Sequence, residues 1–519
     1  MSDLRAVQRV LSAWFVAGVF ASGGLADPWP SAAPRPIDVR AFGARGDGRA
    51  LDTAAINRAI AAAGAAGGGT VRFPAGTYLS ASIHLMSHVG LHLDHGATIE
   101  AAAPALAAYD EPEPNEWGDK RKYQDFGHSH WHNALIWGEN LQDVSIVGPG
   151  LIDGAGLISN DRGPKGAGDK AISLKNCRNV VLRDVSILHG GWFAILATGV
   201  DNLTIDNLKI DTNRDGIDVD ACRNVRISNC TVNSPFDDAI CLKSSYALGR
   251  ARATENVTIT NCQVSGYDEG TLLDGTFKRT VTDKFGPTGR IKLGTESYGG
   301  FRNIAVSNCV FDYSRGLDIA SVDGGPIEDV RITNITMRDI VNAPIFIRLG
   351  SRTRGPGDTL VGAIRRLDIS DVTAYDAGAD QGVLISGIPG HPIEDLRLSN
   401  VRIVSQGGGG AKDDAALDPP ELESDYPEPA RFGRLPAYGL FLRHVKGVEM
   451  HHVDLSYVQD ETRPAVFLDD VDGADFDHVH AQRGPDLITF VLRKVKDFRI
   501  HNSPGLPDRR HDSAEHEAF

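Results

Sequence analysis

The sequence predicts an all-β protein, a single-stranded right-handed parallel β-helix with an N-terminal capping helix. Short segments of alternating apolar and variable residues, each usually followed by Asn or Asp, recur along most of the chain. The copies from Val180 to Val330 lie 23, 22, 32, 47 and 26 residues apart, which fits a solenoid with a basic coil of about 22–26 residues and insertions. The 57 glycines agree with this prediction, because a coiled chain needs many turns.

The repeated segments read as strands that stack from one coil to the next. NVVLRDVSI, NLTIDNLKI and NVRISNCTV show the pattern most clearly. Strands of successive coils should lie about 4.8 Å apart, with Asn side chains satisfying backbone groups at the turns. A leucine-rich repeat has a similar period, but its Leu/Asn consensus is absent. The first apolar residues of the copies include Val180, Leu203, Val225, Val257, Ile304 and Val330.

The open end of a β-helix needs a cover, and the segment LDTAAINRAIAAAGAAGGG can provide it. Asp52 is the expected N-cap of a helix, and residues 67–69 are glycines that should end it. Apolar residues at helical spacing give this helix one face for the core. Those residues are Ile56, Ala59, Ile60 and Ala63.

The N-terminus predicts a signal peptide over residues 1–26. Arg5 and Arg9 precede the apolar run VLSAWFVAGVF, and GLA before Asp27 resembles a small-residue cleavage site. The run is shorter than the ~20 residues of a membrane span, and a short uncleaved anchor is the alternative. We therefore expect a secreted or periplasmic protein. Its β-helix should cover residues 27–505, followed by a flexible C-terminal tail over residues 506–519.

The net charge and the cysteine pattern argue against several kinds of binding partner. The net charge of −15, with scattered lysines and arginines, argues against nucleic acid, and no later segment could span a membrane. We expect a monomer. Four of six cysteines follow Asn, which indicates stacked, buried small residues, and no pair has the CxxC spacing of a zinc site. The cysteines are Cys177, Cys222, Cys230, Cys241, Cys262 and Cys309.

Aspartates are concentrated in residues 213–244, NRDGIDVDACRNVRISNCTVNSPFDDAICLKS. Carboxylates resist burial and repel one another, so this group needs a reason. Asp237 follows Asp215 by 22 residues, one coil, so the two should stack. A bend near Pro235 could turn Asp238 into the same groove. Three carboxylates at one place suit acid/base chemistry, because repulsion raises the pKa of one while the others stay ionised.

A row of turn-capping aspartates is the plainer interpretation of the same residues. We prefer it for Asp218 and Asp220, whereas for the trio the two interpretations are evenly balanced before any family is considered.

The segment resembles glycoside hydrolase family 28, the polygalacturonase family. Residues 213–218 look like the family's NTD followed by GID, and residues 237–238 are similar to its Asp-Asp pair. Residues 42–56 resemble FGAxGDGxxxDTxAI, and residues 150–154 match GxIDG. The resemblance runs from about residue 39 to 341. It implies a right-handed β-helix that hydrolyses α-galacturonide bonds in pectin with inversion.

The resemblance also implies roles for individual residues. Asp237 is then the general acid, and Asp215 and Asp238 activate the attacking water, which should lie between carboxyls about 6.5–9.5 Å apart. No metal and no other cofactor is expected. We expect the substrate to be contacted by Asn213, Lys243, Arg290 and Lys292.

The chain departs from the family in two places. Thr288 stands where the family has the histidine of GHG, and RGLDIAS, with Asp318 and Ala320, stands where the family has RIK. A literal RIK, Arg290 to Lys292, occurs one coil earlier, with both cations on one strand face. They could hold a substrate carboxylate, or Lys292 could be a solvated surface residue.

Three further features are candidates for the groove. HSHWH would place His128, His130 and His132 on one strand face, as metal ligands, groove residues or structural residues. The insertions 109–132 and 405–439 carry aromatics that could stack on sugar rings or pack on the barrel. Those aromatics are Trp117, Trp131, Tyr426 and Phe432.

Together the sequence predicts a secreted glycoside hydrolase acting on a pectin-like or other uronic-acid-containing polysaccharide. A β-helix polysaccharide lyase is the nearer alternative, and it would need Ca²⁺ and a basic residue for proton abstraction. A non-catalytic glycan-binding rod is the alternative from another class.

Overall fold

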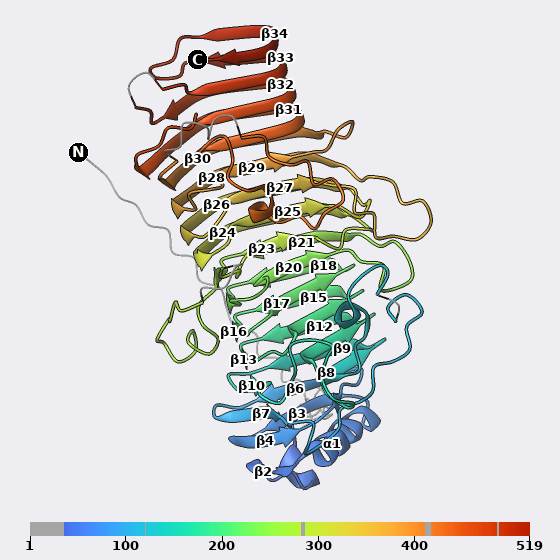
Figure 1. Ribbon diagram of the computed structural model, residues 1–519. Helices are drawn as coiled ribbons and strands as arrows, with labels where there is room; N and C mark the ends of the chain where they lie inside the picture. Colours follow the sequence, from blue (N-terminus) through green and yellow to red (C-terminus); the bar gives the residue numbers. More distant parts are fainter. Residues whose placement is uncertain (1–35, 120, 282–285, 410–416, 485–486) are drawn as a thin grey trace, which may run out of the picture. The chain divides into compact units, whose positions relative to one another are not determined.

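The computed structural model describes residues 36–119, 121–281, 286–409, 417–484 and 487–519. From β2 to β33 these residues form parallel coils stacked in sequence order, which confirms the predicted right-handed parallel β-helix (Figure 1). The signal peptide predicted over 1–26 lies outside the described residues. In the described part of the chain, no helix has the length and apolar character needed to cross a membrane.

Each early coil contributes strands to three parallel faces, and each strand pairs with its counterpart in the next coil. The first face, which carries the candidate site, consists of β5 (Ile83–His84), β8 (Ala134–Glu139), β11 (Lys170–Lys175), β14 (Phe193–Thr198), β17 (Asp215–Asp220), β20 (Ile240–Lys243), β23 (Ile291–Leu293), β25 (Leu317–Ser321), β27 (Ile345–Leu349) and β29 (Val383–Ser386). The second consists of β1 (Ile37–Asp38), β3 (Gly69–Phe73), β6 (Val89–Leu93), β9 (Gln142–Val147), β12 (Arg178–Arg183), β15 (Asp201–Asp206), β18 (Arg223–Ser228) and β21 (Thr254–Thr260). The third consists of β2 (Asp47–Leu51), β4 (Gly76–Ser80), β7 (Ala97–Ala101), β10 (Leu151–Asp153), β13 (Ser186–Leu188), β16 (Lys209–Asp211), β19 (Thr231–Asn233) and β22 (Gln263–Ser265).

Towards the C-terminus the strands run on around the corners between faces. β24 pairs with both β21 and β22, and β31 pairs with both β29 and β30. The long strands are β24 (Phe301–Ser314), β26 (Ile327–Ile340), β28 (Ile364–Ala377), β30 (Ile393–Gly407), β31 (Leu440–Gln459), β32 (Val466–Ala481) and β33 (Phe490–His501).

Asparagine ladders hold the corners, as the repeat predicted. Four of the five amides donate to the Asn one coil earlier, at 2.8 to 3.2 Å, and the first donates to Asp143 at 2.8 Å. All five asparagines have φ between 53 and 57°. Asn tolerates this left-handed conformation better than most residues, which explains its recurrence. The ladder contains Asn179, Asn202, Asn224, Asn256 and Asn303.

The cysteines are also stacked rather than bridged. All six are free and buried. Cys230, Cys262 and Cys309 share one corner position, because their neighbours pair in register, whereas Cys177 lies at a different corner. The Asn-Cys dipeptide therefore occurs at two different corners of the coil, whereas from the sequence we expected a single stacked position.

Both ends of the barrel are covered. Helix α1 (Thr53–Ala65) buries the predicted face, Ile56 and Ile60 included. Asp52 does not cap it through its side chain: the carboxylate accepts from the backbone N–H groups of Arg45 and Gly46 at 2.7 and 2.9 Å. The flexible tail expected over 506–519 is wrong. β34 (Arg509–Ala518) pairs antiparallel with β33 and thereby covers the last exposed edge.

Candidate active site

The candidate site lies on the first face, where β17, β20, β23 and β25 stack. Along β17 the residues alternate, with Ile217 and Val219 in the core and Asp218 facing the opposite side. Gly216 allows two coils to approach closely, since a Cβ there would lie 2.5 Å from the carbonyl oxygen of Ala239. The local sequence GID therefore serves both the core and the site.

The three predicted carboxylates converge. Asp215 begins β17, whereas Asp237 and Asp238 lie in the turn before β20. One carboxylate oxygen from each of the three lies within 4.8 Å of the others. The pairing differs by one residue from the expectation: Ile217 pairs with Ile240, so Asp238, and not Asp237, lies in register with Asp215. The predicted bend before Asp237 accounts for this shift of one residue in the register.

Asp238 is buried among cations. It is 1% exposed, its carboxylate accepts from Arg290 Nε at 2.6 Å, and Lys292 Nζ lies 3.4 Å away. Burial alone would raise the pKa of Asp238, but Arg290, Lys292 and Lys243 together hold it well below its ordinary value. Asp238 is therefore ionised across the working pH range.

Asp215 has the opposite environment. It is 3% exposed, and its Oδ1 has no hydrogen-bond partner. Burial, followed by repulsion from Asp218 and Asp237, raises its pKa well above the ordinary value of an aspartate. Two carboxylates one coil apart thus differ sharply in proton affinity.

Asp237 is the member of the trio that opens toward solvent, with a side chain 23% exposed. Arg214 NH2 lies 2.5 Å from its Oδ2. Its Oδ1 accepts from the backbone N–H of Asp238 at 3.1 Å.

Asp237 lines a pocket of about 550 Å³. Four arginines and two carboxylates face this pocket, so its lining has a net positive charge in a chain of net charge −15. Such a cavity suits an anionic ligand. Its lining residues are Ser159, Asn160, Asn213, Arg214, Phe236, Asp237, Gly286, Thr288, Arg290, Arg315, Tyr426, Glu428 and Arg431.

The predicted substrate contacts divide into two groups. Asn213 and Arg290 line the pocket, as does Thr288, which stands at the family's histidine position. Lys243 and Lys292 do not line it, since both are buried in ion pairs. Lys292 is 1% exposed, so the interpretation as a solvated surface residue is wrong.

The insertion 405–439 contributes one wall of the pocket. Tyr426 lines it, and its hydroxyl accepts from Lys292 Nζ at 3.0 Å. Glu428 joins Arg290 at 3.4 Å and Arg315 at 2.9 Å. Phe432, by contrast, packs in a buried apolar cluster, and Trp131 is fully buried.

Sequence reasoning missed Arg214, Arg315, Glu428 and Arg431. Arg214 was visible inside the quoted NRDG motif, where it replaces a threonine of the family pattern. No signal in the sequence linked the other three to the aspartates, because they come from distant coils and from an insertion.

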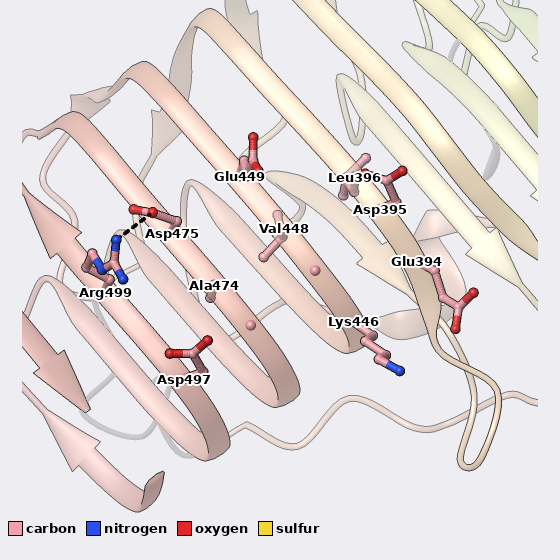
Figure 2. Close-up of a pocket in the computed structure, with 12 residues that line it drawn as sticks. Glu394, Asp395, Leu396, Lys446, Val448, Glu449, Ala474, Asp475, Asp497 and Arg499 are labelled. Atoms are coloured by element: carbon pink, nitrogen blue, oxygen red, sulfur yellow. Dashed lines mark ion pairs between the residues drawn. The ribbon is translucent and has the colours of Figure 1, made fainter. Parts of the chain in front are cut away.

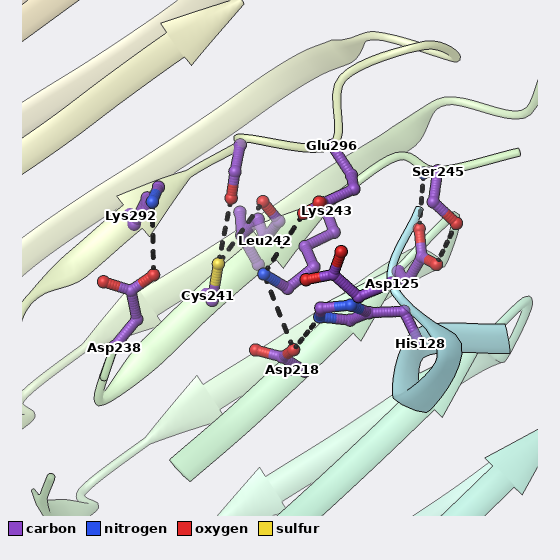
Figure 3. A network of polar contacts seen from close by, with 12 residues as sticks. Asp125, His128, Asp218, Asp238, Cys241, Leu242, Lys243, Ser245, Lys292 and Glu296 are labelled. Atoms are coloured by element: carbon purple, nitrogen blue, oxygen red, sulfur yellow. Dashed lines mark hydrogen bonds and ion pairs between the residues drawn. The ribbon is translucent and has the colours of Figure 1, made fainter. Parts of the chain in front are cut away.

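A buried polar network adjoins the trio on the same face (Figure 3). Lys243 Nζ lies 3.7 Å from Asp218 and 3.4 Å from Glu296, and His128 Nε2 lies 3.3 Å from Asp218. From the sequence we expected Asp218 to cap a turn, and this prediction is wrong. Asp220 does support a turn, since it accepts from the backbone N–H and hydroxyl of Ser245 at 2.7 and 2.5 Å.

The histidines of HSHWH do not share a strand face. His128 belongs to the short 3₁₀ helix η2 (Phe126–Ser129) and faces Asp218. His130 Nε2 meets Asp119 at 2.8 Å, and His132 Nε2 meets Glu139 at 2.9 Å. The three rings therefore have separate partners, and the strand-face prediction is wrong.

Among the described residues, three sets of side chains have a spacing that could hold a cation. Protein cations already lie against each set, because Lys243 contacts Glu296 and Asp218, Arg214 contacts Asp237 and Lys292 contacts Asp238. The sets are Asp125, His128 and Glu296; His128, Asp215 and Asp218; and Asp215, Asp237 and Asp238.

A second hollow, of about 480 Å³, lies on the C-terminal coils and has the opposite charge (Figure 2). Five carboxylates and two cations line it, and Asp475 pairs with Arg499 at 3.5 Å. Its acidic lining does not suit an anionic glycan.

Comparison with known proteins shows which family the chain resembles. The family model "Glycosyl hydrolases family 28" matches residues 116–271, and "Rhamnogalacturonase A/epimerase, pectate lyase-like" matches residues 37–107. A probable polygalacturonase of Vitis vinifera is 26% identical over 389 residues, covering 70% of this chain and 73% of that protein. The first match includes all three aspartates, so the resemblance to family 28 is confirmed.

Solved structures are similar in fold. A family 28 exopolygalacturonase of Yersinia enterocolitica has a TM-score of 0.61 at 17% identity, covering 88% of this chain and 80% of that chain. A hyperthermoactive exopolygalacturonase of Thermotoga maritima has a TM-score of 0.54 at 18% identity, covering 94% and 95%.

Proposed function

We propose that this glycoside hydrolase of the family 28 type hydrolyses galacturonate linkages in a pectin-like acidic glycan. One observation carries the proposal: three carboxylates converge within 4.8 Å beside a cavity whose lining has four arginines and only two carboxylates. The polygalacturonase named among the relatives supports the same substrate class.

The proposed reaction divides the trio by exposure. Asp237, the member that opens into the pocket, gives its proton to the glycosidic oxygen as the carbon–oxygen bond breaks. A water attacks the anomeric carbon and loses its proton to Asp238, which its cations keep ionised. Asp215, when ionised, accepts a hydrogen bond from the same water and aligns it.

Inversion is proposed because a buried base can act on water more easily than on carbon. Asp238 is 1% exposed and contacts both Arg290 and Lys292, so it is poorly placed to attack the sugar directly. The carboxylate oxygens lie within 4.8 Å of one another, closer than the expected 6.5–9.5 Å, because neighbouring coils place all three on one side of the site. The 6.5–9.5 Å spacing applies to two carboxylates on opposite sides of a sugar, with the water between them.

The test is digestion of polygalacturonate by the parent and by Asp237→Asn, Asp215→Asn and Asp238→Asn variants. An amide cannot transfer the proton, so each variant should lose on the order of 10²–10⁴-fold in kcat, without additivity. Proton NMR of the first product should show the inverted anomer. Circular dichroism serves as the folding control, and Asp220→Asn, which alters a turn, should stay active.

Two outcomes would contradict the proposal. Full activity in a folded Asp237→Asn protein would show that another group is the acid, and a folded parent without turnover on any glycan would favour a glycan-binding rod. Ultraviolet absorbance of an unsaturated product would indicate a lyase.

We also propose that the protein is exported, since the charged start, apolar run and small-residue site of residues 1–26 support it. N-terminal sequencing of the exported protein should begin near Asp27. A cytoplasmic protein that still starts at Met1 would contradict this.

A further inference from the structure

The cations expected to hold a substrate carboxylate are already engaged by protein carboxylates. Arg290 contacts Asp238 at 2.6 Å and also Asp318 at 3.1 Å. Lys292 contacts the same two aspartates at 3.4 and 3.6 Å. A sugar carboxylate would have to compete with two buried anions for either cation, at a high cost in desolvation.

Arg214 is placed differently from these two cations. Its side chain is 36% exposed at the pocket, and its ion-pair partner is Asp237, the exposed member of the trio. Its Nε is buried and has no hydrogen-bond partner. If Arg214 turns from Asp237 toward the cavity, this unmet N–H and a terminal N–H can bind a carboxylate ligand, since two parallel N–H groups suit its two oxygens.

The Arg214–Asp237 pair affects where the site keeps its proton. Arg214 occupies Oδ2 of Asp237 at 2.5 Å and the backbone N–H of Asp238 occupies Oδ1 at 3.1 Å, so Arg214 must leave before Oδ2 can carry a proton. Asp215, buried and without a cation in direct contact, is the carboxyl that the surroundings favour in the protonated form. The resting site therefore holds a proton on the buried carboxyl, away from the pocket, where it cannot reach a leaving group.

Resting on the hydrolysis proposed above, we propose that Arg214 binds the carboxylate of the acidic sugar and that this releases Asp237 to take the proton from Asp215. The substrate's charge then switches the site into its reactive form. Arg214 is in this account a specificity-determining residue that acts on turnover as well as on binding.

The step balances in protons and charge. The substrate carboxylate takes over Arg214, so Asp237 loses its cation while it still faces Asp215 and Asp238. Asp237 gains the proton that Asp215 releases, and Asp215 becomes the second ionised group that aligns water. The oxygens lie within 4.8 Å, a gap that one water can bridge. Arg290, one coil further on, remains paired with Asp238 throughout.

A neutral sugar cannot bring about this change. A methyl ester of the same uronate fills the pocket with nearly the same shape but offers no anion to the guanidinium. Arg214 then stays on Asp237 and continues to occupy the oxygen that would have to take the proton. The proposal therefore expects discrimination in kcat, whereas simple charge attraction would appear in KM alone.

The test compares trigalacturonate with its methyl ester in the parent and in Arg214→Gln and Arg214→Lys variants. The parent should turn over the acid roughly 10- to 100-fold faster in kcat, the scale of one charge-assisted contact. In Arg214→Gln the kcat ratio should fall to about 1–3, and the basic limb of the kcat/KM profile should move up by about one pH unit. Arg214→Lys keeps the positive charge but lacks the two parallel N–H groups of the guanidinium, so its kcat ratio should lie between those of the parent and Arg214→Gln.

A control variant separates this role from general charge. Arg431 lines the same pocket and pairs with Asp425, at 3.6 Å, rather than with the trio. Arg431→Gln should change KM at most and leave the basic limb in place.

The outcomes distinguish this inference from the proposed function. A parent that cleaves neither substrate contradicts the hydrolase itself. A parent that cleaves acid and ester with equal kcat, or an Arg214→Gln variant that keeps both the ratio and the pH profile, leaves the hydrolase standing and overturns the role of Arg214.

Discussion

Removing the buried ammonium of Lys292 should damage stability and kcat far more than substrate affinity. In Lys292→Met the side chain keeps its length, but Asp238 loses a cation at 3.4 Å and Asp318 loses one at 3.6 Å. One such pair is worth about 5 kcal/mol by Coulomb's law at an effective dielectric constant of ~20. Breaking a buried pair typically costs about 3–5 kcal/mol, so we expect the free energy of unfolding to fall by that amount.

Urea denaturation and steady-state kinetics on polygalacturonate measure the two effects. Lys446→Met, at an exposed lysine, should change the free energy of unfolding by less than about 0.5 kcal/mol. Adding Asp318→Asn to Lys292→Met should recover part of the loss, because it removes one of the unpaired anions. A Lys292→Met protein with unchanged stability and kcat but a strongly raised KM would refute this reasoning and restore the sequence-based role as a substrate clamp.

Three further predictions follow from burial and pairing. Asp215→Asn should be more stable than the parent at pH 7 but not at pH 4. The pKa of Asp215 is raised above 3.8 in the folded state, so the parent loses stability as the pH rises from about 4. Urea denaturation of both proteins across this pH range measures the difference. Asp220→Asn should lose about 1–2 kcal/mol in the same melts, because its carboxylate holds two groups of Ser245, and an unchanged melt would contradict that role. Deletion of residues 509–519 should cause aggregation, visible by light scattering, since it uncovers the edge of β33, and a monodisperse deletion would show that β34 is dispensable.

The coil architecture could be predicted because it depends on the local periodicity of apolar residues. The first apolar residue of each copy is buried, from Val180 on β12 to Val330 on β26, and the residues beside it point outward. The asparagine at each corner needs only its own backbone conformation and its neighbour one coil earlier. Such nearest-neighbour rules can be read from sequence without knowledge of the whole fold.

The ends and the exact register could not be predicted in the same way. β34 runs antiparallel and lacks the repeat, so its polar sequence looked like a free tail. The turn before Asp237 adds one residue to the coil, and this shifts Asp238, instead of Asp237, into register with Asp215. Spacing alone does not reveal such a bend.

The site's electrostatics were also out of reach of the sequence. The NRD and DD motifs located all three carboxylates and contain Arg214, but the two cations that pair with Asp238 come from elsewhere. Arg290 and Lys292 follow Asp238 by more than 50 residues, across a loop of irregular length. Glu428, which binds Arg290 in turn, arrives from an insertion with no repeat.

The question raised by five aspartates between apolar strand residues has an answer in the stacking of coils. Each carboxylate on the first face meets whatever the next coil places at the same register. For Asp238 that coil brings Arg290 and Lys292, and the carboxylate is held ionised. For Asp215, burial and the nearby carboxylates Asp218 and Asp237 raise the pKa instead. Stacked coils can therefore give identical side chains different proton affinities, according to the burial and the charged neighbours at each register, which is the condition that acid/base catalysis requires.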